Sequence, residues 1–528
     1  MEVNVIGAGL AGAECALQLA KRGIKVNLYE MRPEKTTGAH LSGGFAEFVC
    51  SNSLGSYDIT NASGLLKREM ELLGGELIKI AYECQVPAGG ALAIDRELFS
   101  ARVTDLIEKN KNINIIREEI TQIPDTPTVI ASGPLTSSAL TDSIKEFTQS
   151  ENLHFFDAIA PIVERDSINF DVAFYANRYD KGENYPSPQP SYCTPHPNPL
   201  PQGERENNYK QILSARGEGE NVASYINCPM NKEQYEKFYN ILINAPKIEL
   251  KEFERNAKFF ESCLPIEVLA SRGVDTLRFG PMKPVGLIDK RTGEENYAVA
   301  QLRQDNSAKT LYNLVGFQTN LKWPSQKELL NSIPGLENAN IVRYGVMHRN
   351  TFINSPKVLN ATLQTRKRPD LFFAGQITGT EGYTESIATG LLAGINMARF
   401  LLSVMPECEA STLQGAFLIR HLKNNTNNEI PNMPDISDKQ SSMFRDDVLL
   451  ELPKETMLGS LCAYISDPAH EKFQPINSNW GIIAPIELPK HERKNKKLKN
   501  ELLAKRSINT LAPCGRGLCR TKRLSIVL

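Results

Sequence analysis

The chain has 528 residues, enough for two or more domains, and its 41% hydrophobic and 23% charged residues are typical of a globular protein. A net charge of −1 gives no global positive field for a nucleic acid, so that only a local basic patch could contact one. No apolar run approaches the roughly 18 residues of a membrane span, and the N-terminus lacks a signal peptide, so we expect a cytoplasmic protein without membrane contact. The ten scattered cysteines contain no CxxC pair. We therefore expect neither a metal site nor a disulfide framework.

The first thirty residues predict a dinucleotide-binding unit. An apolar strand at residues 3–6 leads into a glycine turn, an Ala/Leu-rich helix at 13–22 and a second strand at 25–29 that ends at Glu30. Glycines in this pattern permit the tight turn, the approach of the pyrophosphate and the packing of helix on strand, and the acid can accept from ribose hydroxyls. The position at the N-terminus favours FAD. The residues expected to bind it here are Gly7, Ala8, Gly9, Leu10, Ala11, Gly12 and Glu30.

The sequence pattern of the nucleotide-binding unit appears again late in the chain. Residues 128–132, 371–376 and 386–402 predict further strands and a helix of this unit, whereas residues 155–335 change to shorter alternating strands with helices between them. The expected fold class is α/β, an FAD-binding Rossmann-like domain of the glutathione-reductase type with an inserted smaller α+β domain. The expected divisions are 1–150 and 336–405 with 447–511 for the FAD-binding domain, and 151–335 for the insertion domain.

Three stretches look foreign to this plan. Residues 185–219 are dense in Pro, Gly, Asn and charge and predict a disordered surface loop, residues 406–446 form a polar insert, and residues 512–528 form an atypical basic tail. We therefore discount the reactive side chains that these stretches contain as catalytic candidates. They are Cys193, His196, Cys408, Cys514 and Cys519.

Cys50 is the first candidate for chemistry. It lies in a run of residues, 48–54, that follows the second strand and contains Ser51, Asn52 and Ser53. Without a second cysteine nearby, a dithiol reductase is disfavoured. Two interpretations remain, a small buried side chain or, beside a flavin, an activated thiolate.

Cys263 and His348 are the other catalytic candidates. Cys263 precedes basic residues and a Gly-Pro kink at 280–281, which suits an anionic ligand, although a structural cysteine is an equal alternative. His348 lies between Met347 and Arg349 just before the second nucleotide segment and could face a flavin, or could be a structural histidine. For Cys228 we favour packing.

Two features near the C-terminal half complete the set. Gly375, Gln376 and Gly382 precede a helix of small residues that could bring backbone and a helix N-terminus close to a flavin ring, the alternative being tight helix packing. The basic cluster at 491–499 is either a solvated helix face or an RNA-backbone contact.

Taken together, these residues resemble the folate- and FAD-dependent tRNA uracil-C5 methyltransferases, which make ribothymidine in the T-loop. The resemblance covers about residues 1–180, 222–405 and 450–505. The motifs that carry it are at residues 7–12, 48–54, 86–92, 94–96, 263–267, 279–286, 301–304, 316–319, 344–354 and 373–394.

The resemblance implies that bound FAD is reduced by NADH or NADPH, that methylenetetrahydrofolate donates the carbon, and that a cysteine thiolate adds to C6 of a uracil flipped out of the tRNA T-arm. It implies two catalytic cysteines, matching Cys50 and Cys263, without deciding which one attacks, and no obligate protein partner. Two alternatives remain, a flavoprotein that installs carboxymethylaminomethyl groups on wobble uridine and a non-catalytic flavin-binding descendant.

Overall fold

The computed structural model describes most of the chain in several stretches. These are residues 2–150, 153–180, 225–248, 264–289, 291–293, 295–404, 449–489, 491–492 and 494–518. The loop expected to be disordered at 185–219 and the polar insert expected at 406–446 lie outside the described residues, and so does Cys263.

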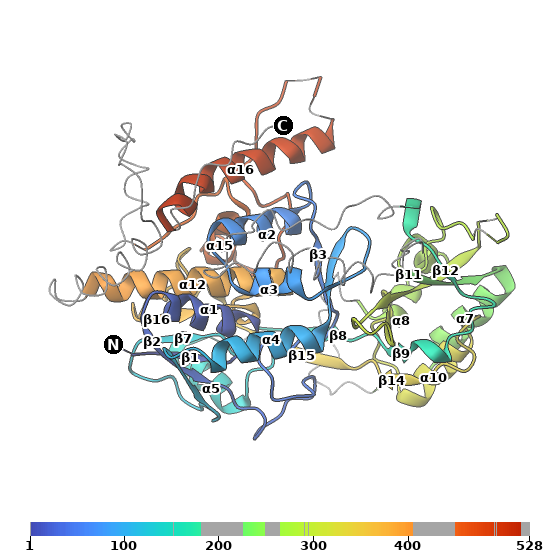
Figure 1. The fold of residues 1–528 in the computed structure, drawn as a ribbon, viewed down its shortest axis with the longest axis horizontal. Helices are drawn as coiled ribbons and strands as arrows, with labels where there is room; N and C mark the ends of the chain where they lie inside the picture. The colour runs from blue at the N-terminus through green and yellow to red at the C-terminus, as the bar shows by residue number, and fades with distance from the viewer. Residues whose placement is uncertain are drawn as a thin grey trace, which may run out of the picture.

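A five-stranded parallel sheet forms the centre of the nucleotide-binding part (Figure 1). Its strand order is β16–β7–β1–β2–β6, with every neighbouring pair parallel. The chain passes from β1 outward to β2 and β6 and then returns to β7 on the other side of β1, so that the strand order reverses between β1 and β7. This Rossmann-like topology confirms the predicted α/β fold. The strands are β1 (Glu2–Ile6), β2 (Lys25–Tyr29), β6 (Ile113–Ile116), β7 (Thr128–Ile130) and β16 (Leu371–Phe373).

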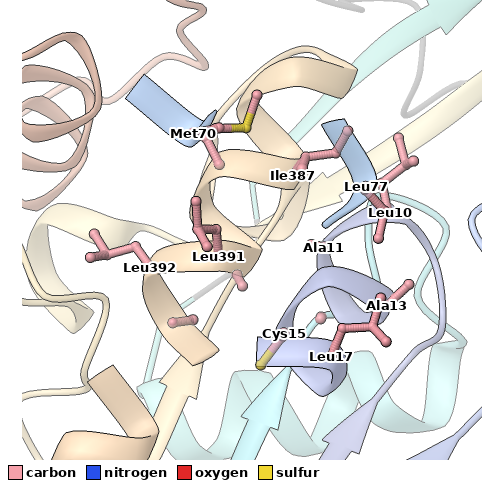
Figure 2. Close-up of a cluster of buried hydrophobic side chains, with 14 of the residues drawn as sticks. Leu10, Ala11, Ala13, Cys15, Leu17, Met70, Leu77, Ile387, Leu391 and Leu392 are labelled. Carbon is pink, nitrogen blue, oxygen red and sulfur yellow. The ribbon is translucent and has the colours of Figure 1, made fainter. Parts of the chain in front are cut away.

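The two segments of the nucleotide-binding domain, which are far apart in sequence, meet where α1 (Leu10–Lys21) packs closely on α12 (Tyr383–Val404). A Cβ built on Gly390 would lie 2.2 Å from the carbonyl oxygen of Ala11, and one on Gly394 would lie 2.8 Å from that of Cys15. Figure 2 shows the apolar side chains of both helices in this buried cluster. These two glycines therefore serve tight helix packing rather than contact with a flavin.

The prediction that no apolar stretch is long enough to span a membrane is wrong for α12. This helix has 22 residues with a mean hydropathy of 1.6 over its most apolar window, which passes the length and composition test for a span. In the structure, 78% of that window is buried inside the protein, because α12 packs against α1 and α2 (Ala62–Leu72). Its apolar character is that of a core helix.

The insertion domain is built on a second sheet (Figure 1, green to yellow). Six strands follow the order β10–β11–β12–β13–β9–β14, and every neighbouring pair is antiparallel. The strands are β9 (Ile162–Glu164), β10 (Phe174–Tyr175), β11 (Tyr225–Met230), β12 (Ala298–Gln304), β13 (Leu311–Leu314) and β14 (Ile341–Arg343). The helices are α7 (Lys232–Asn244), α8 (Ile266–Ala270), α9 (Thr276–Phe279) and α10 (Trp323–Asn331), and they share a separate apolar core with the sheet.

Smaller elements connect and cover these two sheets. The antiparallel pair β8 (Leu153–Ala158) and β15 (Met347–Phe352) links the two parts of the chain. A three-stranded sheet follows the order β3 (Ser53–Ser56), β5 (Ala91–Ile94) and β4 (Gln85–Val86). The remaining helices are α3 (Leu77–Glu83), α4 (Arg96–Glu108), α5 (Ser138–Thr148), α11 (Ser355–Val358), α15 (Met457–Ser466) and α16 (Lys496–Leu518).

A buried glutamate holds the C-terminal helices on the N-terminal part. Glu69 on α2 accepts hydrogen bonds from the backbone N–H groups of Met457 (2.6 Å) and Leu458 (2.8 Å) at the start of α15 and from the hydroxyl of Ser507 on α16 (2.5 Å). Burial raises the pKa of Glu69 to about 7, although these hydrogen bonds oppose the shift. One side chain thereby satisfies N–H groups that a helix start leaves without an intrahelical partner.

Candidate functional site

The glycine turn between β1 and α1 has the geometry that its sequence predicts. Gly7 adopts φ +95°, which favours glycine, and a Cβ on Gly12 would lie 1.7 Å from the carbonyl oxygen of Gly7. A Cβ on Gly9 would meet no atom within 4 Å. Two of the three glycines are thus required by the fold itself, and the third leaves the backbone open to an approaching ligand.

This open turn faces a groove at the carboxyl ends of β1 and β7, where the strand order reverses. The groove encloses about 990 Å³ of space, part of it continuous with solvent. Ligands of open α/β sheets bind at such a reversal point. Its walls come from the glycine turn, the end of β2, the loop after β7 and the segment after β16. They include Gly7, Gly9, Leu10, Ala11, Glu30, Arg32, Ser132, Gly133, Gly375, Gln376 and Tyr383.

Glu30, at the end of β2, lines this groove but is already bound to the protein. Its carboxylate accepts from the N–H of Ala8 (3.0 Å) and from the backbone N, Nε and Nη2 of Arg32 (3.1, 2.8 and 3.1 Å). Arg32 also reaches Glu47 at 3.2 Å. Burial alone would raise the pKa of Glu30, but the hydrogen bonds and charge of Arg32 outweigh it and hold that pKa below its usual value. The role of Glu30 toward a ribose stays a prediction, and no sequence pattern marked Arg32 as part of the site.

The segment after β16 brings Gly375 and Gln376 to the same groove. Gly375 has φ +78°, and its N–H donates to the hydroxyl of Thr389 on α12 (2.9 Å). Gln376 donates to Glu381 (2.6 Å). Gly382, with φ +114°, lies at the start of α12, where a Cβ would fall 2.2 Å from Glu385. Gly375 and Gln376 line the groove, whereas the structure explains Gly382 by the crowded start of the helix.

Cys50 lies at the edge of the groove. Its side chain is half-buried, and its backbone N–H donates to the hydroxyl of Tyr383 (2.6 Å), a residue that lines the groove. Val49, its neighbour, also lines it. The polar run after Cys50 is anchored by Asn52, which is fully buried and donates to the carbonyl oxygens of Ile94 and Gln304, both at 3.0 Å.

Both domains contribute charged residues to the surroundings of Cys50, and the sequence analysis assigned none of them a role in the site. Arg96, the first residue of α4, pairs with Asp305 at 2.8 Å and donates to the carbonyl oxygen of Phe48 at 3.4 Å. Arg303 on β12 and Arg343 on β14 lie in the same electrostatic neighbourhood. Their positions in sequence are far apart, so only the folded chain brings them together.

Other predicted site residues are not joined to this groove by the described contacts. His348 lies on β15, paired in register with Asp157, and its side chain is outside the described part of the structure, as is Cys263. Cys228 on β11 is fully buried, and burial raises the pKa of its thiol, which agrees with the packing role that we favoured. Lys496 and Lys497, in the basic cluster, are exposed.

Both the position of the groove and the polar groups that line it fit an adenine dinucleotide. A helix N-terminus, an open glycine backbone and a buried acid at the end of the second strand meet there. The fold and this site together define the chain as a dinucleotide-binding protein of the Rossmann-like class.

Comparison with known proteins narrows this class. Residues 2–194 and 204–404 match the family model described as glucose inhibited division protein A. The chain is 49% identical over 511 residues to a Brevibacillus brevis protein named methylenetetrahydrofolate–tRNA-(uracil-5-)-methyltransferase TrmFO, covering 96% of this chain and 97% of that protein. An Anoxybacillus flavithermus protein of the same name is 48% identical over 511 residues, covering 97% and 98%. The chain therefore belongs to the glucose inhibited division protein A family and, within it, to the relatives named TrmFO.

Solved structures agree on the fold. Aquifex aeolicus GidA in one crystal form superposes with a TM-score of 0.60 at 17% sequence identity, covering 98% of this chain and 74% of that one. A second crystal form gives a TM-score of 0.53 at 17% identity, covering 98% and 89%. At this level of identity the likeness concerns the fold alone.

Proposed function

We propose that this protein methylates C5 of a uridine in tRNA, with methylenetetrahydrofolate as the carbon donor and reduced FAD as the reductant. The observation that carries the proposal is the near-complete alignment, at 48–49% identity, with relatives named for this reaction. The dinucleotide groove with Cys50 at its edge is consistent with a flavin-dependent reaction that uses a cysteine. We place the target uridine in the T-arm and the protein in the cytoplasm, without an obligate protein partner.

FAD is assigned to the groove at the glycine turn. Gly9 would let its pyrophosphate approach the N-terminus of α1, and the walls at Gly375 and Gln376 would face its ring system. When bound, FAD supplies the reducing equivalents that convert the transferred carbon to a methyl group, and NADH or NADPH restores them as a transient cosubstrate. The residues that line the groove would bind the cofactor and orient it.

The proposed catalytic residues are Cys50, Cys263 and His348. A cysteine thiolate adds to C6 of uracil, which makes C5 nucleophilic enough to capture the carbon. The assignment of Cys50 is supported by the hydrogen bond from its backbone N–H to the hydroxyl of Tyr383, a residue that lines the groove. The target base, stacked within a folded tRNA, must be flipped out to reach it.

The test is methyl transfer to unmodified tRNA by the purified holoenzyme, with methylenetetrahydrofolate and NADPH omitted in turn. Ribothymidine in the T-arm that depends on the folate and is lost in Cys50→Ala supports the proposal. A tRNA whose T-arm uridine is substituted by cytidine is the matched substrate control and should accept no methyl group. A yellow, folded protein that modifies only the wobble uridine would overturn the proposal, and a colourless one would favour the non-catalytic alternative.

A further inference from the structure

One arginine contacts the Cys50 loop directly, and two others lie in its electrostatic surroundings, where the insertion domain meets the nucleotide-binding domain. Arg96 donates through Nε (3.1 Å) and Nη2 (2.8 Å) to one oxygen of Asp305, and through Nη1 to the carbonyl oxygen of Phe48, two residues before Cys50. Arg343 donates to the carbonyl oxygen of Ala39 at 2.8 Å. The third, Arg303, comes from the central strand β12 of the insertion sheet.

The strand that carries Arg303 is fastened to the Cys50 loop by two asparagines. Asn52 donates to the carbonyl oxygen of Gln304, next to Arg303, at 3.0 Å. Asn313 donates to the side-chain oxygen of Asn52 at 3.2 Å and to Asp305 at 2.9 Å, and it accepts from Nη2 of Arg303 at 3.4 Å. Buried amide networks of this kind fix the relative position of the groups they join.

This cluster is short of negative charge. Among the described residues, Asp305 is the only carboxylate within ion-pair distance of any of the three arginines, and its ion pair is with Arg96. The Nε of Arg303 is buried and has no hydrogen-bond partner in the described part of the chain. A buried guanidinium without its hydrogen bonds is costly unless an anion compensates it.

Arg303 and Arg343 have no carboxylate partner within ion-pair distance among the described residues, and their electrostatic surroundings point to the same shortage of negative charge. Burial lowers the pKa of Arg303, Arg96 lowers it further, and Tyr225, Asp305 and Cys50 pull it upward. Burial and Arg96 likewise lower the pKa of Arg343, opposed by Tyr383, Glu47 and Asp305. Cys50 is thus one of the few groups beside Arg303 that can supply negative charge.

We propose that Arg303, supported by Arg96 and Arg343, holds the side chain of Cys50 as a thiolate before substrate binds, its proton having left to solvent. The inference deepens the proposed function, in which Cys50 is catalytic. A thiolate is the nucleophilic form of cysteine, and neighbouring arginines lower the pH at which it forms. Arg303 is then a positioning residue that acts through Cys50.

The test is the pH dependence of alkylation of Cys50 by iodoacetamide in the flavin-loaded protein, followed at the Cys50 peptide by mass spectrometry. We expect Arg303→Gln to raise the apparent pKa by about one unit and to slow alkylation at pH 7 about tenfold. Arg303→Lys keeps the charge and should stay within about threefold of the unmodified chain. Arg278→Gln is the matched control, because Arg278 contacts Asp275 and Tyr297 rather than this cluster.

An Arg303→Gln profile that superposes on that of the unmodified chain overturns the inference. If this variant fails to fold, Arg343→Gln replaces it, and a profile without any upward shift overturns the inference in the same way. The readout does not depend on methyl transfer. A shifted profile in a protein that methylates no tRNA would support the role of Arg303 while overturning the proposed function, and an unshifted profile in an active enzyme would do the reverse.

Discussion

The groove at the glycine turn and the arginine cluster around Cys50 are built in opposite ways. One wall of the groove is a contiguous turn, in which a Cβ on Gly12 would meet the carbonyl oxygen of Gly7, five residues earlier. The cluster takes its shape from Arg96 on helix α4 and from Arg303 and Arg343 on two strands of the insertion sheet, which are far apart in sequence. We therefore expect a local motif to contribute most to cofactor binding, and the surroundings of Cys50 to depend on how the insertion domain docks.

The largest effect is expected at the floor of the groove. Arg32→Met leaves Glu30 buried without its partner, so we expect the flavin-free protein to lose about 3–5 kcal/mol of stability. Denaturant unfolding measures this loss. The double variant Glu30→Gln/Arg32→Met should be less destabilised than the sum of the two single variants, because the orphaned charge is removed. Additive losses would mean that the pair contributes no coupling to this region.

The next largest effect on stability is expected to differ between two glycines of the same turn. Gly12→Ala places a methyl group on the carbonyl oxygen of Gly7, and we expect a loss of about 3 kcal/mol even without flavin. Gly9→Ala meets no protein atom, so its melting temperature without flavin should be unchanged while its affinity for FAD falls. Flavin absorbance and thermal unfolding report the two quantities. Equal destabilisation by both substitutions would contradict the view that Gly9 is kept open for the ligand.

The contrast also explains what the sequence could predict. The strands, the glycine turn and the return of the nucleotide unit at β16 follow from local patterns, and the structure agrees with them. Arg32 and Tyr383 received no role of their own because nothing in their local pattern marks them. Tight helix packing was one of two alternatives for the small residues of α12, and the structure supports it at Gly390. The surroundings of Cys50 could not be predicted, because charged residues that pair between two domains are not separated by any characteristic spacing in the sequence.

A smaller loss of stability is expected in the other region of the comparison, the loop that carries Cys50. Asn52→Ala removes the hydrogen bonds that tie the Cys50 loop to β5 and β12, and we expect a loss of about 1–3 kcal/mol. Methyl transfer should fall further than flavin content, because the groove does not use Asn52. Asn61→Ala, at an exposed site near α2, is the matched control and should leave both unchanged. A parallel loss of flavin and activity in Asn52→Ala would show that the two regions are not separable.

The smallest effect concerns Lys67, which ties the end of the same loop to α2. Its ammonium nitrogen donates to the carbonyl oxygens of Leu54 (2.5 Å) and Ser63 (3.0 Å), and burial lowers its pKa to about 7 although Glu385 and Glu71 oppose the shift. Between pH 7 and the usual lysine value near 10.5, the unfolded chain holds a proton that the folded chain has released, so stability from this group rises with pH across that window. Relative to Lys67→Met, the unmodified chain should gain about 1 kcal/mol from pH 7 to 8. Denaturant midpoints of the two proteins at each pH measure the difference, and parallel curves would mean that the amine exchanges its proton with water as an exposed lysine does.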